Sequence, residues 1–328
     1  MSAYNICSVS TASGNFSQVD KIWSMTPVLY AWMAVDTSST RSLLMASLAS
    51  VWGIRLTWNF NRRGGYEWPP WKGDEDYRWP ALRQGIIPGF TTLDKPVPWM
   101  IFNLTFISFY QNILLWLTAC PSLVVWAVAN SNKCSGAKDL NWLDYTAAVL
   151  MLTFITIEGV ADNQQFAFQT EKYRRKDAGE PLEGDMADGF NQSGLYAVVR
   201  KPNYASEQVR ILMLIIDRLI KSLRPPYLPT NNSKPTQPPI QTTAPNYYFP
   251  KQSIWVCFYF FSVAATGSIL NWSVLGCLLL IMLFQGSGWM TELITLKKYP
   301  KYAVYMKRVG QYLPLKFLWN KVRGEKRD

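Results

Sequence analysis

One polar stripe within an apolar region carries the clearest chemical signal in the sequence. In EGVADNQQFAFQTEK (158–172), polar residues follow one another at intervals of four, three, four and three positions. They are Glu158, Asp162, Gln165, Gln169 and Lys172. This spacing predicts that they share one face of an α-helix. Ionisable side chains inside a membrane span usually face a cavity or a partner helix rather than lipid, so the stripe indicates a polar cavity or helix-to-helix pairing.

A second cluster of polar residues lies in GLYAVVRKPNYASEQVR (194–210), just before an apolar stretch. Its members are Arg200, Lys201, Asn203, Tyr204 and Glu207. Pro202 disfavours helix at the residue before it, which predicts that a helix begins near Pro202. Two cations beside the free N–H groups of a helix start form an anion site suited to phosphate. The alternative is that these basic residues only flank a span and fix its orientation.

Three further charged residues lie in or beside apolar runs. Asp20 precedes the first run, Arg55 interrupts the second, and Glu292 follows the glycine-containing end of the last. A charged residue in such a position is a candidate for function. For Arg55 the alternative is that the long side chain reaches the membrane surface while its stem stays in apolar surroundings.

The absence of one residue type excludes several chemistries. The chain has no histidine, which excludes the iron clusters of membrane desaturases, Ser-His-Asp hydrolysis and histidine-ligated zinc. Its 5 cysteines form no CxxC pair and favour packing as small apolar side chains. We therefore expect no metal.

The apolar runs predict an all-α, polytopic membrane protein. A helix needs roughly 17–25 mostly apolar residues to cross a bilayer. The candidate spans are 23–35, 43–60, 98–128, 143–160, 254–270 and 272–290. The third is long enough for one span plus a re-entrant piece, or for two short spans broken near Pro121. Residues 205–220 form a further half-apolar helix, so we expect about six to seven spans. Many of the 15 tryptophans stand at span edges, where the headgroup layer suits them.

The charge distribution predicts how the chain lies in the membrane. Ten Lys and Arg residues against two acids follow position 296, within a net charge of +11. Basic flanks stay on the cytosolic side, so we expect a cytosolic C-terminus. Such a tail could bind nucleic acid, but beside a last span anionic lipid is the better partner. The first 19 residues show no cleavable signal peptide.

The loops divide the chain into two predicted regions. Residues 1–142 hold the N-terminal membrane helices and an aromatic loop containing GGYEWPPWKGDEDYRW, and residues 143–328 form a C-terminal membrane domain. Within the second region, residues 224–250 are rich in Pro, Thr, Asn and Gln, a composition typical of a disordered insert.

Several motifs resemble a known family. GLYAVVRKPNYASE is similar to the C-terminal signature of the steroid 5-alpha-reductase superfamily, commonly Arg-His-Pro-Asn-Tyr followed by an acid. Sterol reductases and isoprenylcysteine methyltransferases share its general form. The stretches SQVDKIWSMTPVLYAW, GGYEW with EDYRW, VADNQQFAFQ and FQGSGWMTELITLKKYPKY extend the likeness over nearly the whole chain. Together they resemble a little-characterised branch of small membrane proteins in that superfamily.

The resemblance implies a cytosol-facing NADPH pocket in the C-terminal half, as in the endoplasmic-reticulum enzymes of that superfamily. Its matching positions are Glu158, Asp162, Asn203, Tyr204, Glu207 and Glu292, with Gln165 and Gln169 on the same stripe and Arg200 and Lys201 toward phosphate. Where steroid reductases polarise the substrate carbonyl with Glu and Tyr, this chain has Asp20 and Trp52. Lys201 replaces the signature histidine and keeps only its positive charge.

These expectations lead to one functional hypothesis and two alternatives. The hypothesis is an NADPH-dependent reductase of a conjugated C=C bond in a lipid or steroid-like substrate, with Asp20 and Arg55 stabilising the charge that develops on the substrate. The first alternative is a membrane methyltransferase that uses S-adenosylmethionine in the same pocket. The second is a lipid-binding protein without catalysis, which the residues Lys201 and Trp52 favour.

Overall fold

The computed structural model describes residues 3–131, 139–202 and 253–311, and in this part of the chain every regular element is helical. The predicted all-α fold is confirmed. The first half contains α1 (Ala3–Ser13), α2 (Gln18–Ile22), α3 (Thr26–Met33), α4 (Thr40–Asn61), α5 (Arg78–Arg83), η1 (Thr91–Asp94), α6 (Pro96–Phe102), η2 (Asn103–Tyr110) and α7 (Gln111–Ala129). The second contains α8 (Trp142–Asp177), α9 (Asp185–Asp188), η3 (Gly194–Ala197), α12 (Ser253–Thr266), α13 (Val274–Lys298) and α14 (Tyr302–Arg308).

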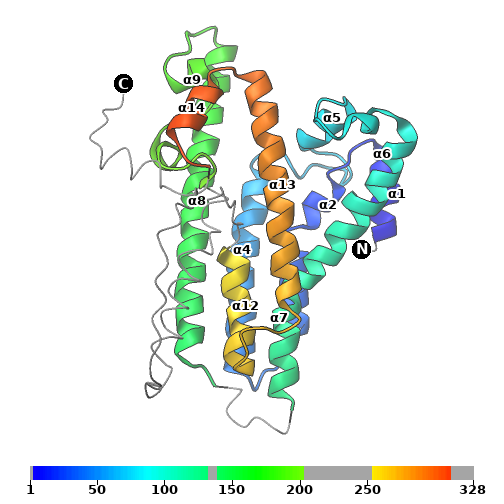
Figure 1. Ribbon diagram of the computed structural model, residues 1–328, viewed down its shortest axis with the longest axis vertical. Helices are drawn as coiled ribbons and strands as arrows, with labels where there is room; N and C mark the ends of the chain where they lie inside the picture. The colour runs from blue at the N-terminus through cyan, green and yellow to red at the C-terminus, as the bar shows by residue number, and fades with distance from the viewer. Residues whose placement is uncertain (1–2, 132–138, 203–252, 312–328) are drawn as a thin grey trace, which may run out of the picture.

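Long helices form a bundle from which a lobe of short helices projects. In Figure 1, α8 and α13 run along the long axis with α4, α7 and α12 beside them, while α1, α2, α5 and α6 form the lobe. The short elements α9 and α14 cap the end of the bundle where α8 and α13 finish. The insert at 224–250 lies outside the described residues.

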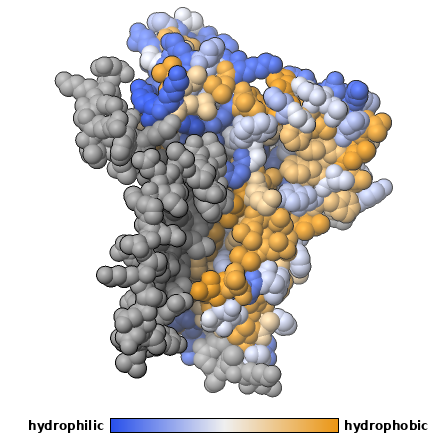
Figure 2. Space-filling model, in the orientation of Figure 1, coloured by the Kyte–Doolittle hydropathy of each residue, from blue (hydrophilic) through white to orange (hydrophobic). Residues whose placement is uncertain are grey.

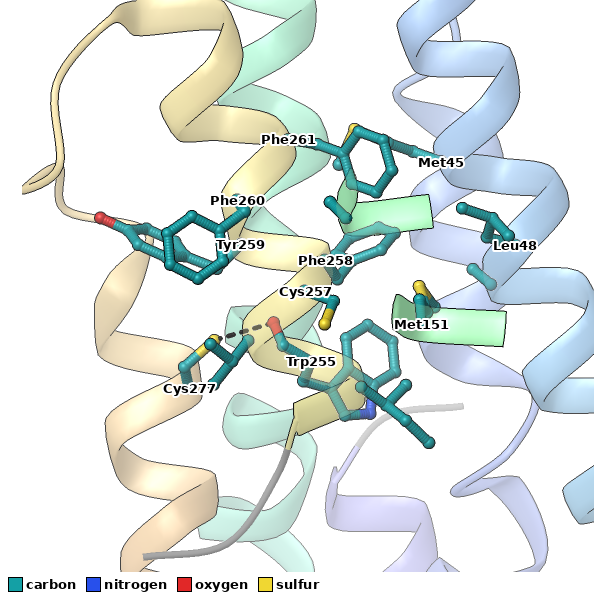
Figure 3. Close-up of a cluster of buried hydrophobic side chains, with 14 of the residues drawn as sticks. Met45, Leu48, Met151, Trp255, Cys257, Phe258, Tyr259, Phe260, Phe261 and Cys277 are labelled. Carbon is teal, nitrogen blue, oxygen red and sulfur yellow. Dashed lines mark hydrogen bonds between the residues drawn. The ribbon is translucent and has the colours of Figure 1, made fainter. Parts of the chain in front are cut away.

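The bundle core combines side chains from both halves of the chain (Figure 3). Met45 and Leu48 of α4, Met151 of α8 and the run Trp255–Phe261 of α12 are buried in one cluster. Trp52 packs edge-on against Trp255 with ring centroids 4.9 Å apart. Cys277 of α13 donates from Sγ to the Trp255 carbonyl oxygen at 3.1 Å. The core thus ties α4, α8, α12 and α13 into one unit.

Helices α7 and α13 approach each other closely at a glycine. A Cβ atom on Gly276 would lie 2.2 Å from the carbonyl oxygen of Leu117, so only glycine permits this packing. Leu117 is the residue whose carbonyl would normally accept from position 121, and Pro121 has no N–H to donate. Gly276 therefore covers a carbonyl that the proline leaves without its helical partner.

Three helices are long and apolar enough to cross a membrane: Pro96–Ala129, Trp142–Asp177 and Val274–Lys298. Large apolar side chains such as Trp116, Val149 and Leu278 stand exposed on their outer faces. Figure 2 shows a broad apolar surface over the bundle and the adjoining lobe. These features fit a protein whose helices contact membrane lipid.

The described residues show fewer spans than the six to seven predicted. The run at 23–35 contains only α3, which has 8 residues and is too short to cross. The run at 254–270 gives α12, whose 14 residues end before Gly267, where φ is +67°. Helix α4 has 22 residues, but Arg55 and many hydroxyl and amide side chains make it less apolar.

Of the two interpretations of the run at 98–128, the one with two short spans broken near Pro121 is wrong. Residues Pro96–Ala129 form one continuous helix in which Asn103–Tyr110 widens into a π-helix and Pro121 lies inside α7. The remaining backbone hydrogen bonds and the cover of a neighbouring helix keep the proline within the span.

A short bridge in the cap positions the basic pair of the second cluster. Val199 and Gly310 form an isolated parallel bridge, so the N–H of Arg200 donates to the Gly310 carbonyl at 2.9 Å. The N–H of Lys201 donates to the Gln311 carbonyl at 3.0 Å. The backbone of both residues is thereby fixed beside the segment that follows α14.

Candidate functional site

Arg55 of α4 lies between the two carboxylates of the polar stripe on α8. Its Nη1 donates to Asp162 Oδ2 at 2.7 Å, and its Nη2 lies 2.8 Å from Glu158 Oε2. The three side chains are only 13%, 12% and 6% exposed for Arg55, Glu158 and Asp162. Arg63 approaches the other Asp162 oxygen at 3.4 Å. The first part of the predicted stripe therefore faces a partner helix and pairs with it.

The second part of the stripe faces the cap. Gln165 and Gln169 are half-buried, and Lys172 donates from Nζ to the Gly189 carbonyl at 2.8 Å and to the Tyr299 hydroxyl at 3.1 Å. Gln164, which the spacing does not select, accepts from the Leu195 N–H at 2.9 Å. One helix thus carries the ion pairs and also holds the cap.

Arg200 is engaged by neighbouring helices. Its Nε donates to Glu292 Oε1 of α13 at 2.9 Å, and both side chains are buried. Its Nη1 donates to the Met306 carbonyl at 3.1 Å and also to the Val309 carbonyl, at the end of α14. The predicted phosphate ligand Arg200 and the predicted cofactor ligand Glu292 are therefore partners of each other.

Lys201 lies among other cations. Burial lowers the pKa of Lys201 to about 8, Glu292 acts in the opposite direction, and the charges of Arg200 and Arg78 lower it further. Lys201 therefore lies near one carboxylate and two cations.

Asp20 of α2 is held by a tryptophan from the lobe. Trp79 donates from Nε1 to Asp20 Oδ2 at 3.2 Å. Burial raises the pKa of Asp20 to about 6 and the charge of Asp76 adds to the shift, while Arg78 and hydrogen bonds from Ser17 and Trp79 oppose it. Asp20 therefore changes its protonation state just below neutral pH.

Asp76 and Arg78 belong to the same site, although no periodic spacing in the sequence selects them. Arg78 donates from Nε and Nη2 to the two Asp76 oxygens at 2.7 and 2.9 Å, and from Nη1 to Ser287 Oγ of α13 at 2.9 Å. Burial acts to raise the pKa of Asp76, but the charge and hydrogen bonds of Arg78, together with Arg63, bring it below its usual value. The EDYRW motif is the available signal for this pair.

These groups form one charged cluster. Arg63 links its two parts, because it contacts Asp162 and its charge also acts on Asp76. The charge of Arg78 acts on both Asp20 and Lys201. The charged cluster consists of Asp20, Arg55, Arg63, Asp76, Arg78, Glu158, Asp162, Arg200, Lys201 and Glu292. It includes both predicted catalytic residues.

Three predicted cofactor ligands, Asn203, Tyr204 and Glu207, lie outside the described residues. Trp52, by contrast, is buried in the bundle core against Trp255. Within residues 3–131, 139–202 and 253–311, no group of three or more metal-ligating side chains could hold a metal ion.

The described residues form an all-helical bundle with three apolar helices of membrane-spanning length, which fits a membrane protein. The chain belongs to the DUF1295 family, described as proteins of unknown function, whose model matches residues 6–219 and 241–309. It is also similar to a Schizosaccharomyces pombe protein named Uncharacterized protein C594.04c. The two are 29% identical over 318 residues, covering 93% of this chain and 74% of the relative. No solved structure matches the chain.

Proposed function

We propose that the protein is an NADPH-dependent reductase of a C=C bond conjugated to a carbonyl in a lipid or steroid-like substrate. The observation that carries the proposal is the charged cluster, in which a carboxyl group with a raised pKa, Asp20, lies within electrostatic reach of cations suited to phosphate. The motifs that resemble the steroid 5-alpha-reductase superfamily lie in the same elements, which supports the assignment.

The donor set of the charged cluster fits a phosphate-bearing cofactor. Around α8, the cations Arg55 and Arg63 face Glu158 and Asp162; around α13, Arg78, Arg200 and Lys201 face Asp76 and Glu292. Arg55 Nε is buried and makes no hydrogen bond with the described residues. Lys201 would meet phosphate, while Glu158 and Asp162 would accept from ribose hydroxyls or the carboxamide.

The chemistry of the proposal needs a hydride, which NADPH supplies when bound. Asp20 in its protonated form and Arg55 would donate hydrogen bonds to the substrate carbonyl oxygen, where negative charge develops. Trp79 keeps the Asp20 carboxyl oriented through its Nε1 donor. The surrounding apolar core restricts water near the reacting atoms.

We infer that the protein crosses the endoplasmic-reticulum membrane several times, with the basic region after position 296 in the cytosol. The excess of Lys and Arg there supports this orientation. Protease added to sealed microsomes should remove a C-terminal tag, whereas full protection of the tag would contradict the orientation.

A labelled-hydride experiment tests the proposed reaction while the substrate is still unidentified. Purified protein is incubated with a lipid extract and NADPH carrying deuterium at the transferable position, and lipids are compared by mass spectrometry. We expect a lipid that gains one deuterium and one hydrogen. A parallel incubation contains S-adenosylmethionine with a labelled methyl group in place of NADPH. Transfer of that methyl group to a lipid, without deuterium transfer from NADPH, would establish the methyltransferase alternative and overturn the reductase proposal.

A further inference from the structure

The loop before α5 builds a bridge between the N-terminal lobe and the bundle. Asp76 receives the Arg78 backbone N–H on Oδ1 at 2.9 Å, in addition to both side-chain bonds from the Arg78 guanidinium. The Asp76 backbone N–H donates to Ser17 Oγ at 2.8 Å, and Ser17 in turn lies within hydrogen-bonding reach of Asp20. On the other side, Arg78 reaches Ser287 of α13. Asp76 and Arg78 thus touch both the support of Asp20 and the helix that carries Glu292.

We propose that Asp76 and Arg78 are positioning residues that decide when Asp20 carries its proton and that link the support of Asp20 to α13. The inference rests on the proposed function only in assigning Asp20 the role of hydrogen-bond and proton donor. The placement of the two residues is independent of which cofactor binds.

Asp76 and Arg78 have opposite effects on the protonation of Asp20. Asp76 faces Asp20 from the loop and favours the protonated carboxyl, while Arg78 at the start of α5 favours the carboxylate. Neutral Ser17 and Trp79 donate to Asp20 from α2's N-terminal side and from α5. Lys201 is also within electrostatic range of Arg78. Neighbouring Lys21 points away and donates to the Pro70 carbonyl at 2.8 Å.

Because Asp76 and Arg78 act on the protonation of Asp20 in opposite directions, substituting each one should give opposite shifts. Loss of structure would not produce that result. Removing Arg78 leaves Asp76 beside Asp20, so Arg78→Gln should raise the pH at which Asp20 loses its proton. Removing the Asp76 charge also releases Arg78 to act on Asp20, so Asp76→Asn should lower that pH. Local unfolding would instead move Asp20 toward its ordinary value in both variants. Arg78→Lys retains the charge and should stay close to wild type.

Carbodiimide labelling measures the protonation directly in the full-length protein. Dicyclohexylcarbodiimide is an apolar reagent that modifies protonated carboxyl groups, and its reaction is followed across pH 4–9 by mass spectrometry. Trypsin releases Met1–Lys21, in which Asp20 is the only acidic side chain, so each peptide reports on one group. Arg83→Gln is the matched control, because Arg83 pairs with Glu75 in the same loop but has no contact with Asp76.

We expect a labelling midpoint near pH 6 in the wild type, shifted by about half a unit or more in opposite directions in the two variants. Arg83→Gln should leave it unchanged. Equal midpoints in all variants, or a common shift downward in Arg78→Gln and Asp76→Asn, would overturn the inference. Because no cofactor is added, these outcomes are separate from any failure of the reductase proposal, which the deuterium experiment reports.

Discussion

The guanidinium of Arg55 lies 2.7 Å from the Asp162 carboxylate and joins the C-terminal part of α4 to the middle of α8. A second Arg–Asp pair, Arg41 with Asp144, joins the N-terminal ends of the same two helices, also at 2.7 Å. Arg41 and Asp144 are almost completely buried, and Asp144 also closes the capping box at the start of α8. The two pairs therefore make similar links, but only Arg55 belongs to the charged cluster.

This similarity allows stability to be separated from ligand binding. Removing either arginine leaves a buried carboxylate without its partner, so Arg55→Met and Arg41→Met should each lower stability by about 3–5 kcal/mol. Only Arg55→Met should also weaken NADPH binding. Thermal unfolding in detergent and NADPH titration measure the two effects, and equal loss of NADPH affinity in both variants would contradict a local role for Arg55.

The raised pKa of Asp20 predicts a pH-dependent gain in stability when its charge is removed. The folded-state pKa is about 6 against an ordinary 3.8. The free-energy cost of burying the ionised Asp20 carboxylate is therefore absent below about pH 4 and fully present above about pH 6. The stability of Asp20→Asn relative to the wild type should therefore rise between pH 4 and 6, by at most about 3 kcal/mol. Thermal shifts measured across this range test the sign, and a gain largest at pH 4 would contradict it.

Arg200 and Lys201 are adjacent in sequence, yet the structure predicts different phenotypes. Arg200→Gln removes the bond to Glu292 and to two carbonyls of the cap, so it should lower stability by about 2 kcal/mol or more. Lys201→Gln leaves the bonds of Arg200 in place, and it should lower NADPH affinity about tenfold. Titration and unfolding of both variants separate the roles, and a Lys201→Gln protein that binds NADPH like wild type would remove Lys201 from the phosphate site.

The close contact between α7 and α13 at Gly276 allows the packing of these two helices to be tested. Gly276→Leu would force a side chain against the Leu117 carbonyl and should destabilise the protein by about 2–4 kcal/mol. Gly286 lies on the same helix with no atom within 4 Å of its would-be Cβ, so Gly286→Leu should be tolerated. Melting temperatures of the two variants in detergent should differ by several degrees. Equal melting temperatures would show that α13 packs differently.

The sequence was enough to predict which runs form helices, but it was not enough to predict where each helix ends. Apolar runs identified α7, α8 and α13 because long apolar stretches have few alternatives to a helix. The continuity of α7 through Pro121 depends on Gly276, which follows it by 155 positions, and no local pattern indicates that contact. The early end of α12 at Thr266 depends on the conformation of Gly267, which the hydropathy of the run does not reveal.

Site residues were identifiable by type, but their partners were not. The four-three spacing correctly placed Glu158 and Asp162 on one helix face, and Arg55 is unusual in an apolar run, yet nothing local joins positions 55 and 162. Arg200 fits a phosphate site by its place before an apolar stretch, but Glu292, 92 positions later, is its partner. Asp76 and Arg78 were missed because a loop has no periodicity that would indicate a shared face.

Calorimetric titration of the detergent-solubilised full-length protein with NADPH and with S-adenosylmethionine tests the central claim most directly. The two cofactors differ in charge, since NADPH carries phosphates and S-adenosylmethionine carries a positive sulfur. Under the reductase proposal, Lys201 distinguishes them by this difference. We expect NADPH to bind the wild type, to bind Lys201→Glu far more weakly, and S-adenosylmethionine to bind neither. Binding of S-adenosylmethionine without NADPH would contradict the reductase proposal, and binding of neither would favour a lipid-binding protein without catalysis.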